Sequence, residues 1–334
     1  MLSQAKILIL SIFLFYSCNS NAYVEIRGYT MGTTYSIKIT QPIINQNKIQ
    51  RDVDSILYSI NMEMSTYIDS SDISRFNKSS PGLKYSLKDD FYKVISVARD
   101  FYNTTNGYFD ITINPLVELW GFSKGGYIET IPSPELIDST LKYIGMEKLI
   151  IGEDKSITKE KTLTIDLSAI AKGYAVDKIS EYLDELSFNN YMVEIGGEVR
   201  ALGKKNKDEG WIIGVQNPNK DDVDSILKIN LLNKSLATSG NYRNYYDIDG
   251  KKYSHIISPL TGYPINNDIL SVSVISEECI NADALATALM IFNPHKGIKF
   301  VENLEKTEVF YVLDGNKTLF SSGFKKYCAN DKNK

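Results

Sequence analysis

The feature that most constrains the fold is a series of short strand-like segments between Tyr191 and Val274. They follow one another with turn-forming residues between them: YMVEI, EVRALG, WIIGVQ, SILKINLL, KSLATS, KYSHII and LSVSVI. Short segments of this kind, joined directly by turns, indicate strands that pair mainly antiparallel. A regular alternation of strand and helix, which would build a parallel sheet, is therefore not expected.

Helical patterns precede and follow this series. Apolar residues at helical spacing or helix-ending residues mark them at 49–60, 90–103, 134–145, 169–187, 282–292 and 295–304. Further strands are expected at TTYSIKIT, TLTIDL, EVFYVL and KTLF, and TLTIDL should run into the helix that begins near Ala169. The order of elements predicts an α+β fold with mainly antiparallel sheets flanked by helices.

Composition narrows the classes of protein and of site. The 334 residues are 43% hydrophobic and 23% charged, which allows one large domain or two lobes around a packed core. The net charge of −4 gives no support for a nucleic-acid partner, which favours clustered positive charge. His255 and His295 are the only histidines, so a histidine-rich metal site is excluded. Cys279 and Cys328 could form a disulfide in an oxidising compartment, but the sequence does not give their separation.

The N-terminal residues have the layout of a secretory signal. Lys6 precedes an apolar run, Ile7 to Tyr16, that is too short to span a bilayer. Ser17-Cys18 then resembles the processing site of bacterial lipoproteins; a plain signal peptide with an incidental cysteine is the alternative. We therefore expect a signal peptide (1–17), lipid on Cys18, a tether (18–24) and one folded domain (25–334). The protein would be exported and lipid-anchored to a bacterial membrane, facing the periplasm.

The segment NADALATALMIF places Asp283 and Thr287 four residues apart on one helix. Residues with this spacing share a helix face, so a carboxylate and a hydroxyl point to the same place. The common explanation is that Asp283 lies in the first turn and complements the helix dipole.

Other segments carry polar groups at turns. IDLSAIAKGYAVD places an acid at the end of a strand and a polar turn before a helix, which is a natural site for an anion or a metal. Lys172 in the first turn of that helix opposes its dipole. Gly196-Gly197 allows close backbone approach or bends a strand. His255 ends an alternating strand, and a lone histidine is more often structural than catalytic.

Taken together, these segments resemble the ApbE family, the FAD:protein FMN transferases. The resemblance rests on eight segments in order: MGTTYSI, MSTYIDSSDISRFN, GYFDITINPLVELWGF, IDLSAIAKGYAVD, EIGGEVRALG, ATSGNYRNYY, YSHIISPLTGYP and NADALATALM. It implies an ApbE-like fold with two intimately packed lobes. It also implies transfer of FMN from FAD to a threonine or serine of another protein, with a phosphoester bond formed and AMP released.

The resemblance further implies which residues form the site. Asp283, Thr287 and the backbone carbonyl of Ala169 would hold Mg²⁺, with Mn²⁺ or Ca²⁺ as alternatives; oxygen ligands suit such hard cations. The residues expected to contact FAD are Met31, Tyr67, Tyr108, Phe109, Asp110, Asp166, Lys172 and Ile257. His255 is the candidate general base, because an imidazole titrates near working pH. A carboxylate beside the metal, such as Asp283, is the alternative base.

Two other functions fit the same motifs. A magnesium-dependent FAD pyrophosphatase would use water in place of the protein hydroxyl and give FMN and AMP. A non-catalytic FAD-binding lipoprotein would store or deliver flavin, although binding FAD alone does not need a metal pair. For the transferase, the resemblance implies acceptor flavoproteins such as FMN-binding subunits of membrane redox complexes.

Overall fold

The structure is a computed structural model that describes residues 23–207, 209–218, 225–241, 245–248 and 250–329. The expected signal peptide, Cys18 and all of the tether except its last two residues lie outside these ranges. Among the described residues, no helix combines the length and the apolar character that crossing a membrane would require.

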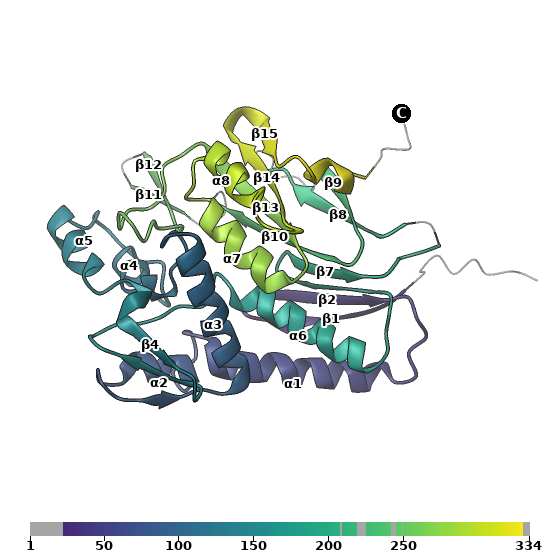
Figure 1. Ribbon diagram of the computed structural model, residues 1–334, viewed down its shortest axis with the longest axis horizontal. Coiled ribbons are helices and arrows are strands. Elements are labelled where there is room, and N and C mark those ends of the chain that lie inside the picture. The colour runs from purple at the N-terminus through teal and green to yellow at the C-terminus, as the bar shows by residue number, and fades with distance from the viewer. Residues whose placement is uncertain (1–22, 208, 219–224, 242–244, 249, 330–334) are drawn as a thin grey trace, which may run out of the picture.

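One eight-stranded antiparallel sheet forms the centre of the molecule (Figure 1). Its strand order is β1-β2-β6-β7-β10-β13-β14-β15, and neighbouring strands pair antiparallel. The strands are β1 (Val24–Thr30), β2 (Thr33–Ile39), β6 (Tyr191–Ile195), β7 (Glu198–Leu202), β10 (Lys234–Gly240), β13 (Ile269–Ser276), β14 (Glu308–Leu313) and β15 (Lys317–Phe320). The sheet confirms the predicted α+β class with mainly antiparallel pairing.

Helices cover one face of this sheet, and a β-hairpin covers the other. The helices are α1 (Gln46–Met64), α3 (Asp89–Thr104), α6 (Ala171–Glu185), α7 (Cys279–Leu289) and α8 (Pro294–Val301); the hairpin joins β8 (Trp211–Gln216) and β9 (Ser225–Leu231). Strand β14 shows why both faces are buried: Val309 and Tyr311 pack with residues of the helices, while Phe310 and Val312 pack with residues of the hairpin. Successive side chains of a strand point to opposite faces, so an apolar strand requires two covering layers.

A smaller lobe lies beside the sheet. It contains α2 (Asp72–Lys78), α4 (Asn114–Leu119), α5 (Pro134–Leu141), the sheet β3 (Tyr85–Ser86), β5 (Ser156–Lys159) and β4 (Leu149–Gly152), and the hairpin β11 (Tyr245–Ile248) with β12 (Lys251–Ser254). A separate apolar cluster around Leu116 and Trp120 forms part of its core. The indole N–H of Trp120 donates to the carbonyl of Gly262 at 2.8 Å, which ties α4 to the segment after His255.

Several sequence predictions about local structure were wrong. The segment TLTIDL is not a strand. Part of its backbone makes hydrogen bonds to side chains, where a strand would make them to a neighbouring strand. Asn77 on α2 accepts from Ile165 N (2.8 Å) and donates to Ile165 O (2.9 Å). The strand before His255 ends at Ser254, and α7 begins at Cys279, three residues earlier than expected.

The cysteines lie apart in the fold. Cys279 opens α7 and is buried, whereas Cys328 follows the last 3-10 turn, and both are free thiols.

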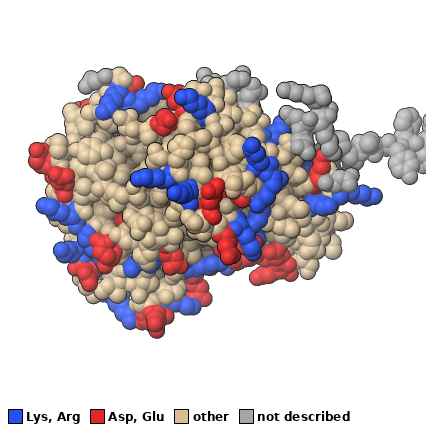
Figure 2. Space-filling model, turned by 45° about the horizontal axis from the view of Figure 1, so that its top comes forward, with Lys and Arg blue, Asp and Glu red and all other residues tan. Residues whose placement is uncertain are grey.

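Charged side chains of both signs lie interspersed on the face shown in Figure 2.

Candidate functional site

Two adjoining cavities form a cleft between the lobes. One has a volume of about 460 Å³ and the other about 610 Å³. Thr66, Tyr67, Asp166 and Ser168 line both, so the two cavities share a wall. Thr66 and Tyr67 belong to the loop after α1, and Asp166 and Ser168 to the turn before α6. A cleft of this combined size suits a dinucleotide-sized ligand.

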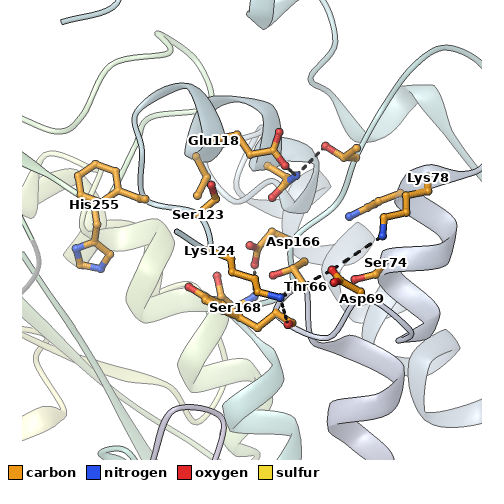
Figure 3. A pocket seen from close by; sticks show the side chains of 16 residues that line it. Thr66, Asp69, Ser74, Lys78, Glu118, Ser123, Lys124, Asp166, Ser168 and His255 are labelled. Atoms are coloured by element: carbon orange, nitrogen blue, oxygen red, sulfur yellow. Dashed lines mark hydrogen bonds and ion pairs between the residues drawn. The ribbon is translucent and has the colours of Figure 1, made fainter. Parts of the chain in front are cut away.

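The smaller cavity is polar. Figure 3 shows His255 at one end and Lys78 at the other, with Asp166 between them. Lys124 reaches across the opening: its ammonium donates to the carbonyl of Tyr67 at 2.9 Å and lies 3.8 Å from Asp69. Lys78 pairs with the same Asp69 at 4.0 Å. Both lysines pair with Asp69, and Glu118 and Asp166 line the same cavity, so the cavity offers ammonium donors to an anionic ligand without a net positive charge.

The larger cavity contains Met31, Tyr67 and Lys172 among its lining residues, three of the side chains expected to contact FAD. Met31 and Gly32 form the two-residue turn between β1 and β2, and both have positive φ (49° and 73°). Such a turn matches the twist of antiparallel strands. Tyr67 is 58% exposed, so a large part of its ring is available to a ligand.

The turn that carries Asp166 is held from three sides. The backbone N–H of Asp166 donates to the carbonyl of Ile111 at 2.7 Å, and its carboxylate accepts from Ser168 N at 2.6 Å. The side chain of Asn77 makes hydrogen bonds to both the N–H and the carbonyl of the preceding Ile165. The buried ammonium of Lys159 donates to the carbonyls of Phe76, Asn77 and Leu163. These contacts fix α2 and the turn relative to each other, so Asp166 is presented to the cleft in one position.

A cluster of three charged side chains lies where α6, α7 and β7 meet. Lys172 Nζ is 2.9 Å from Glu198 Oε1 and 4.0 Å from Asp283 Oδ1. Burial alone lowers the pKa of Lys172, but the charges of Asp283 and Glu198 outweigh it and raise that pKa above its ordinary value. Burial raises the pKa of Glu198. Asp283 and Glu198 are both almost fully buried.

Asp283 and Thr287 do share a face of α7, as their spacing predicts. Oδ2 of Asp283 accepts from Gly173 N at 2.9 Å, and Oγ1 of Thr287 lies 3.2 Å from Oγ of Ser239 on β10. The close approach of α6 and α7 requires glycine at 173, because a Cβ there would lie 2.4 Å from the carbonyl oxygen of Cys279.

The donor atoms around Asp283 fit a hard divalent cation. They are a carboxylate and hydroxyl groups, and Mg²⁺ is usually held by one or two carboxylates together with substrate phosphates. In the described part of the chain, no three His, Cys, Asp or Glu residues gather as a complete metal site. A cation here would therefore take further ligands from hydroxyls, backbone carbonyls, water or the substrate, and Ala169 lies in the turn just before α6.

Four residues expected to contact FAD do not line either cavity. Phe109 is buried against Phe101, and Tyr108 packs against Phe292 with ring centroids 4.3 Å apart. Asp110 accepts from the N–H and the hydroxyl of Thr112, and burial raises its pKa to about 6. Ile257 belongs to the apolar cluster of the smaller lobe.

His255 does reach the cleft. It follows β12 directly, lines the smaller cavity and packs edge-on against Phe122, with ring centroids 6.3 Å apart. The stacking of Phe122 on Tyr246 and the hydrogen bond from Tyr246 to Gly121 O connect β11 to the same loop. Aromatic residues of this loop therefore pack beside the imidazole.

The sequence reasoning missed several residues of the cleft, Lys78, Lys124, Asn77, Asn114, Glu118 and Ser168. It also missed Glu198, which pairs with Lys172 in the charged cluster. Asn77 and Glu198 lie in two of the segments quoted above, MSTYIDSSDISRFN and EIGGEVRALG. Each is a polar residue at a position where the pattern of the segment predicts burial. That signal could have found them. Nothing local in the sequence pairs Lys124 with Tyr67, because 57 residues separate them.

Comparisons with known proteins show the family. Residues 31–311 match the ApbE family. The FAD:protein FMN transferase of Vibrio cholerae is 38% identical over 323 residues, which are 95% of this chain and 96% of that protein. The Escherichia coli protein of the same name is 32% identical, covering 92% and 90%.

Solved structures agree. The flavin transferase ApbE from Vibrio cholerae superposes with a TM-score of 0.83 at 37% identity, covering 91% of this chain and 99% of that one. The ApbE protein of Thermotoga maritima gives 0.83 at 33% identity, covering 92% and 100%. From sequence matches and fold alike, this chain belongs to the ApbE family.

Proposed function

We propose that this chain transfers FMN from FAD to a serine or threonine hydroxyl of an acceptor protein. The observation that carries the proposal is the cleft: His255 and Asp166 line one cavity, Lys172 and Asp166 line the other, and the chain as a whole matches relatives named for this transfer. FAD as the substrate follows from the family.

In the proposed reaction the acceptor oxygen attacks the phosphorus that carries the riboflavin unit. The new P–O bond forms as the bond to the bridging oxygen breaks, and AMP leaves. The hydroxyl proton passes to His255, which lines the cavity from the end of β12. Lys78 and Lys124 also line that cavity, and their ammonium groups are the donors there that would bind the phosphates of the dinucleotide.

Asp283, Thr287 and the carbonyl of Ala169 are the proposed ligands of Mg²⁺. When bound, such an ion spreads the negative charge of the phosphates and of the leaving group. The chain's own part is to hold the carboxylate in place, and Gly173 N does so with its hydrogen bond to Oδ2 of Asp283.

Hydrolysis of FAD to FMN and AMP is the competing activity, since water could replace the protein hydroxyl in the same site. The test mixes purified protein, FAD, Mg²⁺ and a candidate acceptor flavoprotein. In-gel flavin fluorescence reports transfer, and AMP and free FMN are measured in the same tubes. Fluorescent acceptor with equimolar AMP supports transfer. AMP with free FMN and a dark acceptor indicates a pyrophosphatase, and bound FAD without AMP indicates storage.

We further propose that the protein is a lipoprotein held to a bacterial membrane through Cys18 and facing the periplasm. Support comes from the sequence alone: a short apolar run that ends in Ser17-Cys18. Cys18→Ala should release the protein from membranes while purified activity stays normal. Unchanged membrane association, with no lipid mass on the N-terminal peptide, would rule the anchor out.

A further inference from the structure

The ammonium of Lys172 lies between the buried carboxylates of Glu198 and Asp283, but it is closer to Glu198. The ammonium is within hydrogen-bond distance of Glu198, at 2.9 Å, and only within ion-pair distance of Asp283, at 4.0 Å. Glu198 follows the Gly196-Gly197 turn, whose two glycines both have positive φ (61° and 105°), so the backbone turns sharply just before this carboxylate. The lysine is therefore drawn toward β7.

The other oxygen of Glu198 has no hydrogen-bond donor. Oε2 is buried, and no group in the described ranges donates to it. An unsatisfied buried carboxylate oxygen is costly, so a role in fold stability alone does not explain a glutamate at this position. Its one strong contact is the ion pair with Lys172.

We infer that Glu198 is a positioning residue that holds the positive charge of Lys172 away from Asp283 and so leaves Oδ1 of Asp283 open to a divalent cation. The inference rests on the proposed function for the identity of the cation site. It differs from a ligand role, because Glu198 acts through Lys172 and does not touch the cation.

The physical argument is competition for one carboxylate. Without Glu198, the nearest negative partner of Lys172 is Asp283, and closing the 4.0 Å separation to a hydrogen bond would occupy Oδ1. Oδ2 already accepts from Gly173 N, so both oxygens would then hold a hydrogen-bond donor and the cation would have to share an oxygen with one of them. A lysine in direct contact would also repel the cation, since charges at such short distances interact strongly in a buried site.

The experiment measures binding of Mn²⁺ to FAD-loaded protein by the loss of its free electron-spin-resonance signal, with no acceptor present. Glu198→Gln should raise the dissociation constant of Mn²⁺ at least about tenfold. The reason is that an ammonium in contact with Asp283 would repel the cation, and the repulsion between two unit charges this close costs more than a tenfold loss of affinity. Because Lys172 lines the larger cavity, FAD is kept saturating for every variant, and Lys172→Met alone should then bind Mn²⁺ as tightly as wild type or more tightly.

The decisive measurement is the double variant. In the Lys172→Met background, Glu198→Gln should change the dissociation constant by less than about threefold, because the competing ammonium is gone and the two effects are not additive. Glu194→Gln is the matched control. Glu194 lies on β6, and its carboxylate accepts a hydrogen bond from Gly197 N at 2.8 Å but does not contact Lys172. It should leave Mn²⁺ binding unchanged.

The outcomes separate the alternatives. Equal weakening by Glu198→Gln in both backgrounds would mean that Glu198 acts on the cation directly, and the inference would be wrong. No weakening, or no Mn²⁺ binding by the wild type, would overturn it as well. If Glu198→Gln does not fold, as judged by its thermal melt, Glu198→Asp and the double variant carry the test. Because no acceptor is used, failure of FMN transfer would not affect these readings.

Discussion

Asp177 and Asp283 each cap the helix on which the other lies. Asp177 of α6 accepts from the N–H groups of Cys279 (2.9 Å) and Ile280 (2.8 Å), at the start of α7. Asp283 of α7 accepts from Gly173 N, at the start of α6 (2.9 Å). The residues just before the two helices, Ile170 and Glu278, make no side-chain cap of their own. The two helices are thus stabilised as a pair, and the proposed cation site lies at their junction.

Two substitutions of Asp283 should distinguish its structural role from its chemical role. Asp283→Asn keeps an oxygen for Gly173 N but loses the charge, so Mg²⁺-dependent transfer should be abolished while the melting temperature stays close to wild type. Asp283→Ala should also lose the cap and cost about 1–2 kcal/mol of unfolding free energy. Transfer assays and urea unfolding on both variants check this. Normal transfer by Asp283→Asn with EDTA present would contradict the cation assignment.

Asp177→Ala should weaken the fold without changing the chemistry. It leaves two buried N–H groups without acceptors, which should cost about 2–4 kcal/mol of unfolding free energy. Turnover per folded molecule should stay normal, because the carboxylate of Asp177 accepts from N–H groups at the start of α7 and is not a proposed ligand of FAD or of the cation. Urea unfolding and single-turnover transfer at low temperature measure the two quantities. A stable but inactive variant would show that this residue does more than cap α7.

Gly173→Ala should force the helix pair apart. The new methyl group would lie 2.4 Å from the carbonyl oxygen of Cys279 and 2.7 Å from Cβ of Asp283. Overpacking of this kind costs about 1–3 kcal/mol, and the shift of Asp283 should weaken cation binding as well. Glu181→Ala, on the exposed side of the same helix, is the control and should stay within about 0.5 kcal/mol of wild type. An alanine variant as stable as the control would mean that α6 and α7 can separate without loss.

His255→Ala tests the proposed base. If His255 accepts the hydroxyl proton, FAD affinity should be nearly unchanged and single-turnover transfer should fall by roughly 10²–10⁴-fold. Phe122→Leu, which removes the ring packed on the imidazole, is expected to give a smaller loss because the base is present but less well oriented. Affinity, melting temperature and turnover are measured on one preparation. Normal turnover in a stable, FAD-loaded His255→Ala protein would move the role to a carboxylate beside the cation.

Asp110 should make stability depend on pH. Its pKa is raised from 3.8 to about 6, chiefly by burial, so the folded state holds its proton more tightly than the unfolded chain. The contribution is complete below pH 3.8 and is lost as pH rises through 6. Relative to Asp110→Asn, which keeps an acceptor for Thr112 N, wild type should lose up to about 3 kcal/mol of unfolding free energy between pH 4 and 7. Parallel curves for the two proteins would show that the carboxyl group is not desolvated as the fold implies.

Sequence periodicity determined most of the elements by itself. The alternation along TTYSIKI, the continuous apolar run EVFYVL and the helical stripe from Ile49 to Ile60 appear in the structure as β2, β14 and α1, because β2 and α1 each bury one face whereas β14 buries both. The Asp283 and Thr287 pair on one face of α7 was likewise predictable, since the spacing of four is fixed by helix geometry.

Only the tertiary structure decided which helix Asp283 stabilises, and which partner holds Lys172. Asp283 is the fifth residue of α7, past its first turn, and the dipole that it complements belongs to α6, 110 positions away in sequence. The segment TLTIDL reads as a strand, yet Asn77 on α2 takes the place of a neighbouring strand, so Asp166 lies in a cleft wall and not at the end of a sheet. The physical reason is the same in each case: a hydrogen bond or ion pair between distant segments is fixed by their packing, which no local pattern of residues encodes.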